Sequence, residues 1–139
     1  LHELKIKNYR SFRDEVVLSF EASTDDRYNS TVTMPDKVKL LRFAVVLGAN
    51  AIAGGYRFSL RVLEQDADKD DEGTDVQPFL MQPDALSHDT ELEASIYVEG
   101  VRYLYQLTIN PEKVMSETLF VYNTNRPTKI FTRQDVNGI

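Results

Sequence analysis

The stretch FAVVLGANA, residues 43–51, is the part of the sequence that indicates most about the fold. Its first five residues are apolar, and a run of small residues follows at once: Gly48, Ala49, Asn50 and Ala51. A short unbroken apolar run predicts a strand buried on both faces of a sheet. A loop that starts with glycine can take a positive φ and turn its backbone N–H groups toward an anion. The stretch therefore suits either a phosphate-binding loop or a core strand that ends in an ordinary turn.

The residues after this stretch do not complete a phosphate loop. A P-loop has the spacing G-x-x-x-x-G-K-[ST], in which the lysine and the hydroxyl residue contact phosphate and Mg²⁺. Counted from Gly48, the second glycine and the lysine are replaced by Ala53 and Gly54. The loop is therefore either degenerate or interrupted after Ala51. The poor fit of residues 52–55 to the start of a helix favours an interruption.

The composition is that of an ordinary soluble domain. The chain has 139 residues, of which 42% are hydrophobic and 27% are charged. No apolar run approaches the roughly 18 residues that a membrane-spanning helix needs. The absence of cysteine excludes disulfides and thiolate chemistry. We therefore expect a cytoplasmic protein without membrane contact.

The acidic side chains are concentrated in one segment. Residues 61–90 hold two basic and nine acidic side chains, in a chain whose net charge is −6. Nothing resembles the basic stripe of a nucleic-acid groove, so any surface that binds DNA is expected elsewhere. The acidic run 66–75 lacks the glycine that an EF-hand needs at its sixth position, and we interpret it as a solvated linker. Residues 56–65 have a weakly helical pattern.

Alternating patterns predict strands at both ends of the chain. Leu4 and Ile6 alternate with lysines, and residues 16–20 repeat the pattern, which predicts two antiparallel strands joined by a connector at residues 8–12. The polar residues 21–36 predict a surface loop. The second half predicts an antiparallel meander with strands at 91–99, 101–109, 114–122 and 129–133, and with a turn at Gly100.

Residues that carry catalysis are not identifiable. His2 and His88 are isolated in the sequence, and we interpret both as solvated surface residues. The motifs G-x-S-x-G and H-E-x-x-H are absent. The sequence therefore assigns no catalytic residue and no metal ligand.

Three segments, taken together, resemble the amino-terminal portion of ABC-type ATPases of the RecF/SMC/OLD group. In that family the first hairpin carries N-[FY]-[RK]-S-[FL], which residues 8–12 match. The following strand ends in a Walker A loop that begins G-x-N-[AG], which residues 48–51 match. The pattern E-[LIV]-x-[AILV]-x-[IFL]-x-x-[DEN]-G-x-x-Y at residues 91–103 resembles the β-subdomain of the family. The similarity covers about two-thirds of the chain.

The resemblance implies a site, cofactors and partners. It implies ATP and Mg²⁺ as cofactors, a homodimer formed through ATPase heads, and a partner such as DNA or a nuclease. The later family motifs and the G-K-[ST] segment do not occur here, so this chain alone is not expected to hydrolyse ATP. The residues that the resemblance places at the nucleotide are Arg10, Ser11, Gly48, Ala49, Asn50 and Ala51.

These observations predict an α/β protein, the amino-terminal lobe of a P-loop NTPase of the ABC-ATPase type. Its strands would be mostly antiparallel, with one parallel core strand at residues 43–47. We expect a hairpin and P-loop strand over 1–55, a weak helix and acidic linker over 56–90, and a meander over 91–139. The alternative is a non-enzymatic β-rich interaction domain in which Gly48 to Ala51 form a degenerate phosphate loop.

Overall fold

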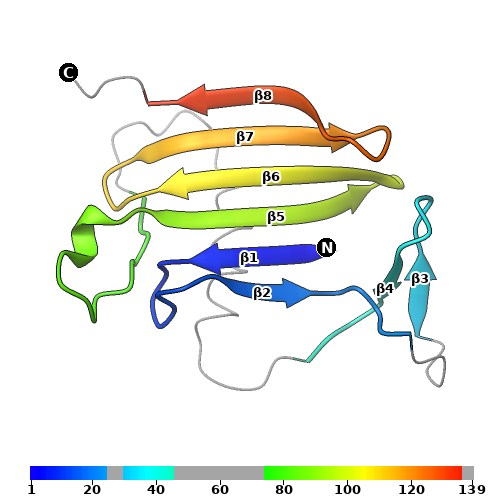
Figure 1. The fold of residues 1–139 in the computed structure, drawn as a ribbon, viewed down its shortest axis with the longest axis horizontal. Coiled ribbons are helices and arrows are strands. Elements are labelled where there is room, and N and C mark those ends of the chain that lie inside the picture. Colours follow the sequence, from blue (N-terminus) through cyan, green and yellow to red (C-terminus); the bar gives the residue numbers. More distant parts are fainter. Residues whose placement is uncertain (25–29, 46–73, 136–139) are drawn as a thin grey trace.

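The computed structural model describes residues 1–24, 30–45 and 74–135 (Figure 1). This part of the chain contains eight strands and one short 3₁₀ turn, and it has no α-helix. The strands are β1 (Glu3–Lys7), β2 (Val16–Ser19), β3 (Thr31–Thr33), β4 (Lys39–Leu41), β5 (Thr90–Val98), β6 (Val101–Ile109), β7 (Val114–Tyr122) and β8 (Thr128–Gln134), and the 3₁₀ turn η1 is Ala85–Ser87.

Six of the strands form one antiparallel sheet in the order β2-β1-β5-β6-β7-β8. The amino-terminal hairpin thus lies beside the carboxy-terminal meander, because β1 pairs with β5 (Figure 1). The remaining strands, β3 and β4, form a separate antiparallel hairpin. Glu99 and Gly100 both have positive φ, 51° and 82°, as a tight two-residue turn between β5 and β6 requires.

The predicted α/β fold is wrong, and so is the described part of its predicted parallel core strand at residues 43–47, of which residues 46 and 47 lie outside the described residues. Every strand pair in the described part of the chain is antiparallel. Residues 43–45 are not in a strand, and the side chains of Phe43 and Val45 are 68% and 75% exposed. The strand β1 pairs with β2 on one edge and with β5 on the other, so no further strand can join the sheet beside it.

The core lies on one face of the sheet, where alternate residues of β1, β5 and β6 meet. Leu4 pairs with Ala94 and Ile6 with Leu92, so their side chains point to the same side. Tyr9 and Val76, which lie outside the strands, also belong to this cluster. The buried apolar residues of the cluster are Leu4, Ile6, Tyr9, Val76, Leu92, Ala94, Leu107 and Ile109.

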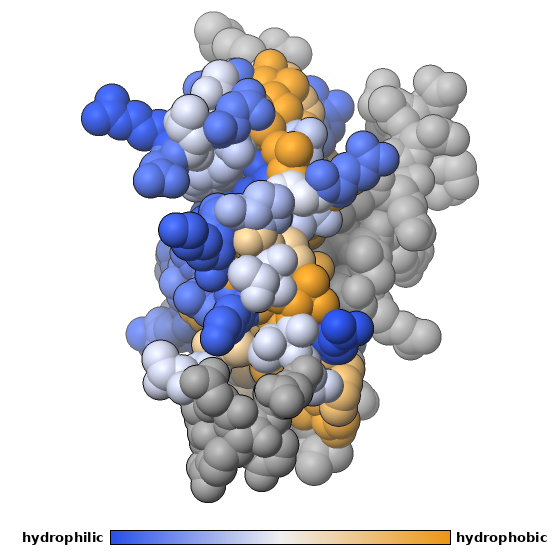
Figure 2. Space-filling model, turned by 90° about the vertical axis from the view of Figure 1, so that its right-hand side faces the viewer, coloured by the Kyte–Doolittle hydropathy of each residue, from blue (hydrophilic) through white to orange (hydrophobic). Residues whose placement is uncertain are grey.

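The opposite face of the sheet is polar. Lys5 pairs with Glu93 and Lys7 with Glu91 across the β1–β5 ladder, and both pairs form salt bridges, at 2.9 and 2.8 Å. Figure 2, which views the sheet along its strands, shows polar side chains gathered on one side and a band of apolar side chains next to them. The period of two in the sequence thus appears as two chemically distinct faces.

The predicted hairpin near the amino terminus and the predicted meander are confirmed, with β7 at the expected residues. The loop expected at 21–36 differs, because Thr31–Thr33 form β3, which pairs with β4. The weak helix at 56–65 and most of the acidic linker, residues 66–73, lie outside the described residues.

Candidate functional site

Asn8 organises the connection between β1 and β2. The residue is buried and has φ 50°, a conformation that asparagine adopts more readily than most residues. Its amide nitrogen donates hydrogen bonds to the carbonyls of His88 at 2.7 Å and Asp89 at 3.2 Å. Its amide oxygen accepts from the backbone N–H of Phe79 at 3.2 Å, and its carbonyl accepts from the Thr90 hydroxyl at 2.6 Å. One side chain therefore joins the β1 end to the segment before β5.

The turn that follows presents Arg10 and Ser11 at its tip. Tyr9 and Phe12 exchange two backbone hydrogen bonds, at 2.8 and 2.9 Å, which close the turn. The backbone N–H of Arg10 donates to the carbonyl of Gln77 at 2.8 Å, and Arg10 has φ 49°. Both tip residues are exposed. The turn is thus hydrogen-bonded to its neighbours while its two tip residues are exposed.

The cation of Arg10 is not neutralised by the described residues. None of their carboxylates lies within salt-bridge distance of its guanidinium, which stands 5.4 Å from the centre of the Tyr9 ring. Arg13, in contrast, contacts Asp14 at 3.4 Å. A guanidinium and a hydroxyl side by side on a fixed turn offer several hydrogen-bond donors to an anion such as phosphate.

Of the six predicted site residues, Arg10 and Ser11 lie in the described part of the chain, where both are exposed at the tip of the turn. Gly48, Ala49, Asn50 and Ala51 lie outside the described residues, so a joint site with Arg10 stays a prediction.

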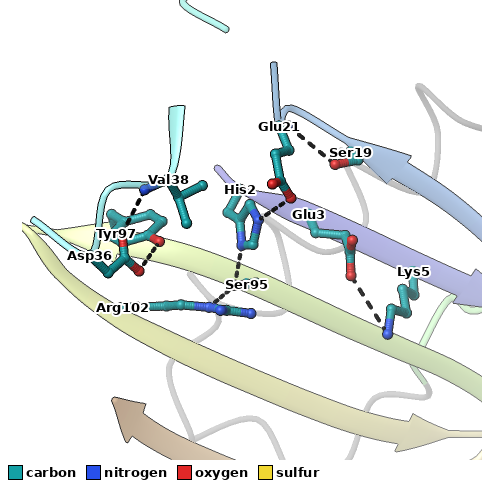
Figure 3. A network of polar contacts seen from close by, with 10 residues as sticks. All are labelled: His2, Glu3, Lys5, Ser19, Glu21, Asp36, Val38, Ser95, Tyr97 and Arg102. Carbon is teal, nitrogen blue, oxygen red and sulfur yellow. Dashed lines mark hydrogen bonds and ion pairs between the residues drawn. The ribbon is translucent and has the colours of Figure 1, made fainter. Parts of the chain in front are cut away.

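A buried polar cluster, which the sequence did not indicate, lies at the other end of β1 (Figure 3). His2 is only 6% exposed, so its interpretation as a solvated surface residue is wrong, whereas His88 is exposed as expected. The Nδ1 atom of His2 lies 3.0 Å from the hydroxyl of Ser95, which accepts a hydrogen bond from Nε of Arg102 at 3.0 Å. The Nε2 atom of His2 lies 3.7 Å from a carboxylate oxygen of Glu21.

This serine, histidine and glutamate do not form a hydrolytic site. A nucleophilic serine must reach a substrate carbonyl, but Ser95 is only 3% exposed. Its hydroxyl is also occupied by Arg102 on one side and His2 on the other. The guanidinium of Arg102 in turn stacks 4.6 Å from the ring centre of Tyr122. These contacts join His2, the residue before β1, to β5, β6 and β7, and we interpret the cluster as structural.

Tyr97 connects this cluster to the β3–β4 hairpin (Figure 3). Its hydroxyl donates to the carboxylate of Asp36 at 2.6 Å. Burial, together with this hydrogen bond, raises the pKa of Tyr97 to about 12. The same bond lowers the pKa of Asp36. A Cβ atom at Gly100 would lie 3.1 Å from Pro35, so the hairpin also packs closely on the β5–β6 turn.

The polar face carries a shallow depression of about 260 Å³ across β1, β5, β6 and β7. Its charged groups already satisfy one another, because Lys5 contacts Glu93, which also accepts from Gln106 at 2.7 Å. Burial by itself would raise the pKa of Glu93, but the hydrogen bonds from Gln106 and Lys5 lower it. A ligand here would have to displace these internal pairs, which makes the depression a poor candidate site.

The described residues do not by themselves supply a Mg²⁺ site, since no three His, Asp or Glu side chains among them converge on one point. In the same residues, no helix is long and apolar enough to cross a membrane. Comparisons of the chain with protein-family models, with curated proteins and with solved structures find no match.

Proposed function

We propose that the chain binds ATP through the turn at Arg10 and Ser11, as part of an ATPase similar to the RecF/SMC/OLD group. The observation that carries the proposal is the turn itself, in which Asn8 and Gln77 hold the backbone while a hydroxyl and a guanidinium with no carboxylate partner among the described residues are exposed. The proposal requires no parallel strand, because the antiparallel β1–β2 hairpin alone positions these side chains.

Each group has a chemical role at the polyphosphate. Arg10 would donate charge-assisted hydrogen bonds to phosphate oxygens, and the Ser11 hydroxyl would add a neutral donor. The backbone N–H groups of residues 48–51 would provide a second set of donors from the glycine loop. Because the motifs for Mg²⁺ coordination and hydrolysis do not occur in this chain, turnover would need further residues.

In the whole ATPase, this binding would have a mechanical consequence. We propose that ATP closes a homodimer of ATPase heads and that turnover drives action on a partner such as DNA or a nuclease. A cytoplasmic location belongs to the same proposal. The rival function is that of a non-enzymatic β-rich interaction domain, which the exposed strand β8 favours.

Calorimetry with Mg²⁺ and ATP tests the proposal on the 139-residue chain. We expect micromolar binding for the wild type and binding that is at least about tenfold weaker for Arg10→Ala, because one charge-assisted contact is lost. Arg13→Ala is the matched control, since Arg13 lies three residues along the same loop but contacts Asp14.

Arg10→Lys separates charge from geometry, because lysine keeps the charge but loses the planar fork. A thermal melt of each variant shows whether the fold is intact, which we expect because Arg10 is exposed. Absence of binding at millimolar ATP would refute the proposal and leave the interaction domain. Equal losses from Arg10→Ala and Arg13→Ala would refute the assignment to this turn.

A further inference from the structure

The two edges of the six-stranded sheet differ. At the β2 edge, the chain that follows the strand is covered by β4. The backbone N–H of Leu41 donates to the carbonyl of Phe20, and that of Ala22 donates to the carbonyl of Lys39, both at 2.8 Å. Glu21 forms an isolated bridge with Leu40. The chain thus protects part of this edge with its own backbone.

The β8 edge is open in the described part of the chain. Strand β8 pairs with β7 alone, and all seven of its residues are exposed. Two of them are large and apolar, Ile130 at 51% and Phe131 at 40% exposure. An edge strand presents a row of unpaired N–H and C=O groups, which another extended chain can bind.

The open edge is also basic, although the whole chain is acidic. Residues 126–134 contain Arg126, Lys129 and Arg133 and no acidic residue. Arg133 pairs with Glu117 at 3.1 Å. Lys129 and Arg126 have no acidic partner among the described residues. Two cations without an acidic partner in the described part of the chain therefore border the exposed backbone.

From these features we propose that the β8 edge binds an extended acidic segment of another polypeptide, which adds a strand to the sheet. The backbone groups of β8 would hold the segment, as in other cases of β-augmentation. Acidic side chains of the segment would lie near Lys129 and Arg126, and an apolar one would cover Ile130 and Phe131.

A second copy of this chain is the less suitable occupant. Pairing β8 with β8 would bring together two basic strands without an acid in either one. The register between β7 and β8 also shifts, because Leu119 lies opposite Phe131 while Phe120 lies opposite Lys129. This bulge leaves Ile130 as an extra residue, and two copies paired through β8 would each bring such an interruption to the shared ladder.

Nuclear magnetic resonance on the ¹⁵N-labelled chain tests the proposal. The probes are short extended peptides in which glutamate alternates with valine. Matched peptides carry lysine for glutamate, or backbone N-methyl groups that block pairing. We expect the acidic peptides to shift the amide signals of residues 128–134 and to slow their hydrogen exchange. The lysine and N-methyl peptides should do neither.

Charge reversal locates the contact. Lys129→Glu should weaken binding of the acidic peptides about tenfold or more and permit binding of the lysine peptides. Arg13→Glu is the control, because it makes the same charge change on the β1–β2 connection, and it should leave binding unchanged. If the Lys129→Glu variant bound the acidic peptides as tightly as the wild type, the charge of Lys129 would not select the partner, and that part of the proposal would be overturned.

Two further results would refute the proposal itself. One is the absence of shifts in residues 128–134 with every acidic peptide at millimolar concentration. The other is a concentration-dependent dimer of the chain, seen by sedimentation, that protects the β8 amides from exchange, because the edge would then be occupied by a second copy. ATP binding at Arg10 is unaffected by either result, so this inference and the proposed function fail separately.

Discussion

Strands β1 and β8 belong to the same antiparallel sheet, yet they differ in what covers them. In β1 the side chains of Leu4 and Ile6 are 1% and 3% exposed, whereas in β8 every residue is exposed. Both strands pair antiparallel with a neighbour, β1 in continuous register with β5, and β8 with one bulge against β7. Pairing alone therefore makes a strand, but only packing against a second layer makes a core.

The covered half of the sheet is also the half that contains long-range polar connections. Asn8 bonds to residues about 80 positions away in the sequence, and His2 contacts Ser95. Among the described residues, β8 pairs with β7, the preceding strand. We therefore expect the free energy of unfolding to depend much more on the β1–β5 side than on the β7–β8 side.

The largest effect should come from the core position Leu4. Leu4→Ala removes a side chain that is 1% exposed and should lower the free energy of unfolding by about 3 kcal/mol. Phe131→Ala in β8 should cost less, about 1 kcal/mol, because that side chain is 40% exposed. Urea denaturation of both variants measures the difference. Equal losses would contradict the contrast between the two strands.

The next effect concerns the connection made by Asn8. Asn8→Ala removes the donors to His88 and Asp89 and the acceptor for Phe79, and should cost about 2 kcal/mol. Asn8→Asp keeps the acceptor oxygen and should cost less. Asn8→Gly keeps the positive φ without strain but loses the side chain. If Asn8→Gly were as stable as the wild type in urea, the positive φ at this position, and not the side-chain hydrogen bonds, would account for the stability that Asn8 provides.

Alkaline pH should weaken the contact between β5 and the β3–β4 hairpin, which the Tyr97–Asp36 hydrogen bond makes. The pKa of Tyr97 rises to about 12 in the folded chain, above its value of about 10 in an unfolded chain. The contribution of the protonated Tyr97 hydroxyl to the free energy of unfolding is thus fully present below pH about 10. It is lost as the pH rises toward 12. Tyr105, bonded to Glu117 across β6 and β7, has its pKa raised by burial and adds to the same loss.

Urea unfolding between neutral pH and pH about 11 measures this dependence. Tyr97→Phe should be less stable than the wild type at neutral pH and should show a shallower decline above pH about 10. An unchanged slope in Tyr97→Phe would mean that the bond to Asp36 does not form in solution.

The smallest effect is expected from the ladder of charges on the polar face. A double-mutant cycle on Lys5 and Glu93 should give a coupling of about 0.5 kcal/mol, because the pair is only partly buried. The more exposed pair of Lys7 and Glu91 should couple less strongly and should be lost first as salt is added. If the two pairs had comparable coupling free energies at high salt, partial burial of Lys5 would not strengthen its interaction with Glu93.

Local patterns in the sequence predicted most of the sheet correctly. The alternation over residues 91–122 predicted β5, β6 and β7, because a period of two places one set of side chains on each face wherever the strand lies. The turn at Gly100 followed from the backbone freedom of glycine. The turn with Arg10 and Ser11 was expected as a connector between two strands, and it is one.

Other features depended on partners far away in the chain. The apolar residues 43–45 are not in a strand, and the positions on both sides of β1 are taken by β2 and β5. His2 is isolated in the sequence, but the chain folds Ser95, Tyr97 and Glu21 around it. Residues 31–33 look like a polar loop and become β3 only through β4.

By itself, the sequence determined which segments form strands and which of their faces are apolar, because alternation and turn chemistry act over a few neighbouring residues. Tertiary structure alone decided that β1 pairs with β5, that His2 is buried, and that β8 has only β7 beside it among the described residues. The physical reason is that pairing order and burial depend on contacts between segments up to about 90 residues apart. No local pattern encodes such contacts.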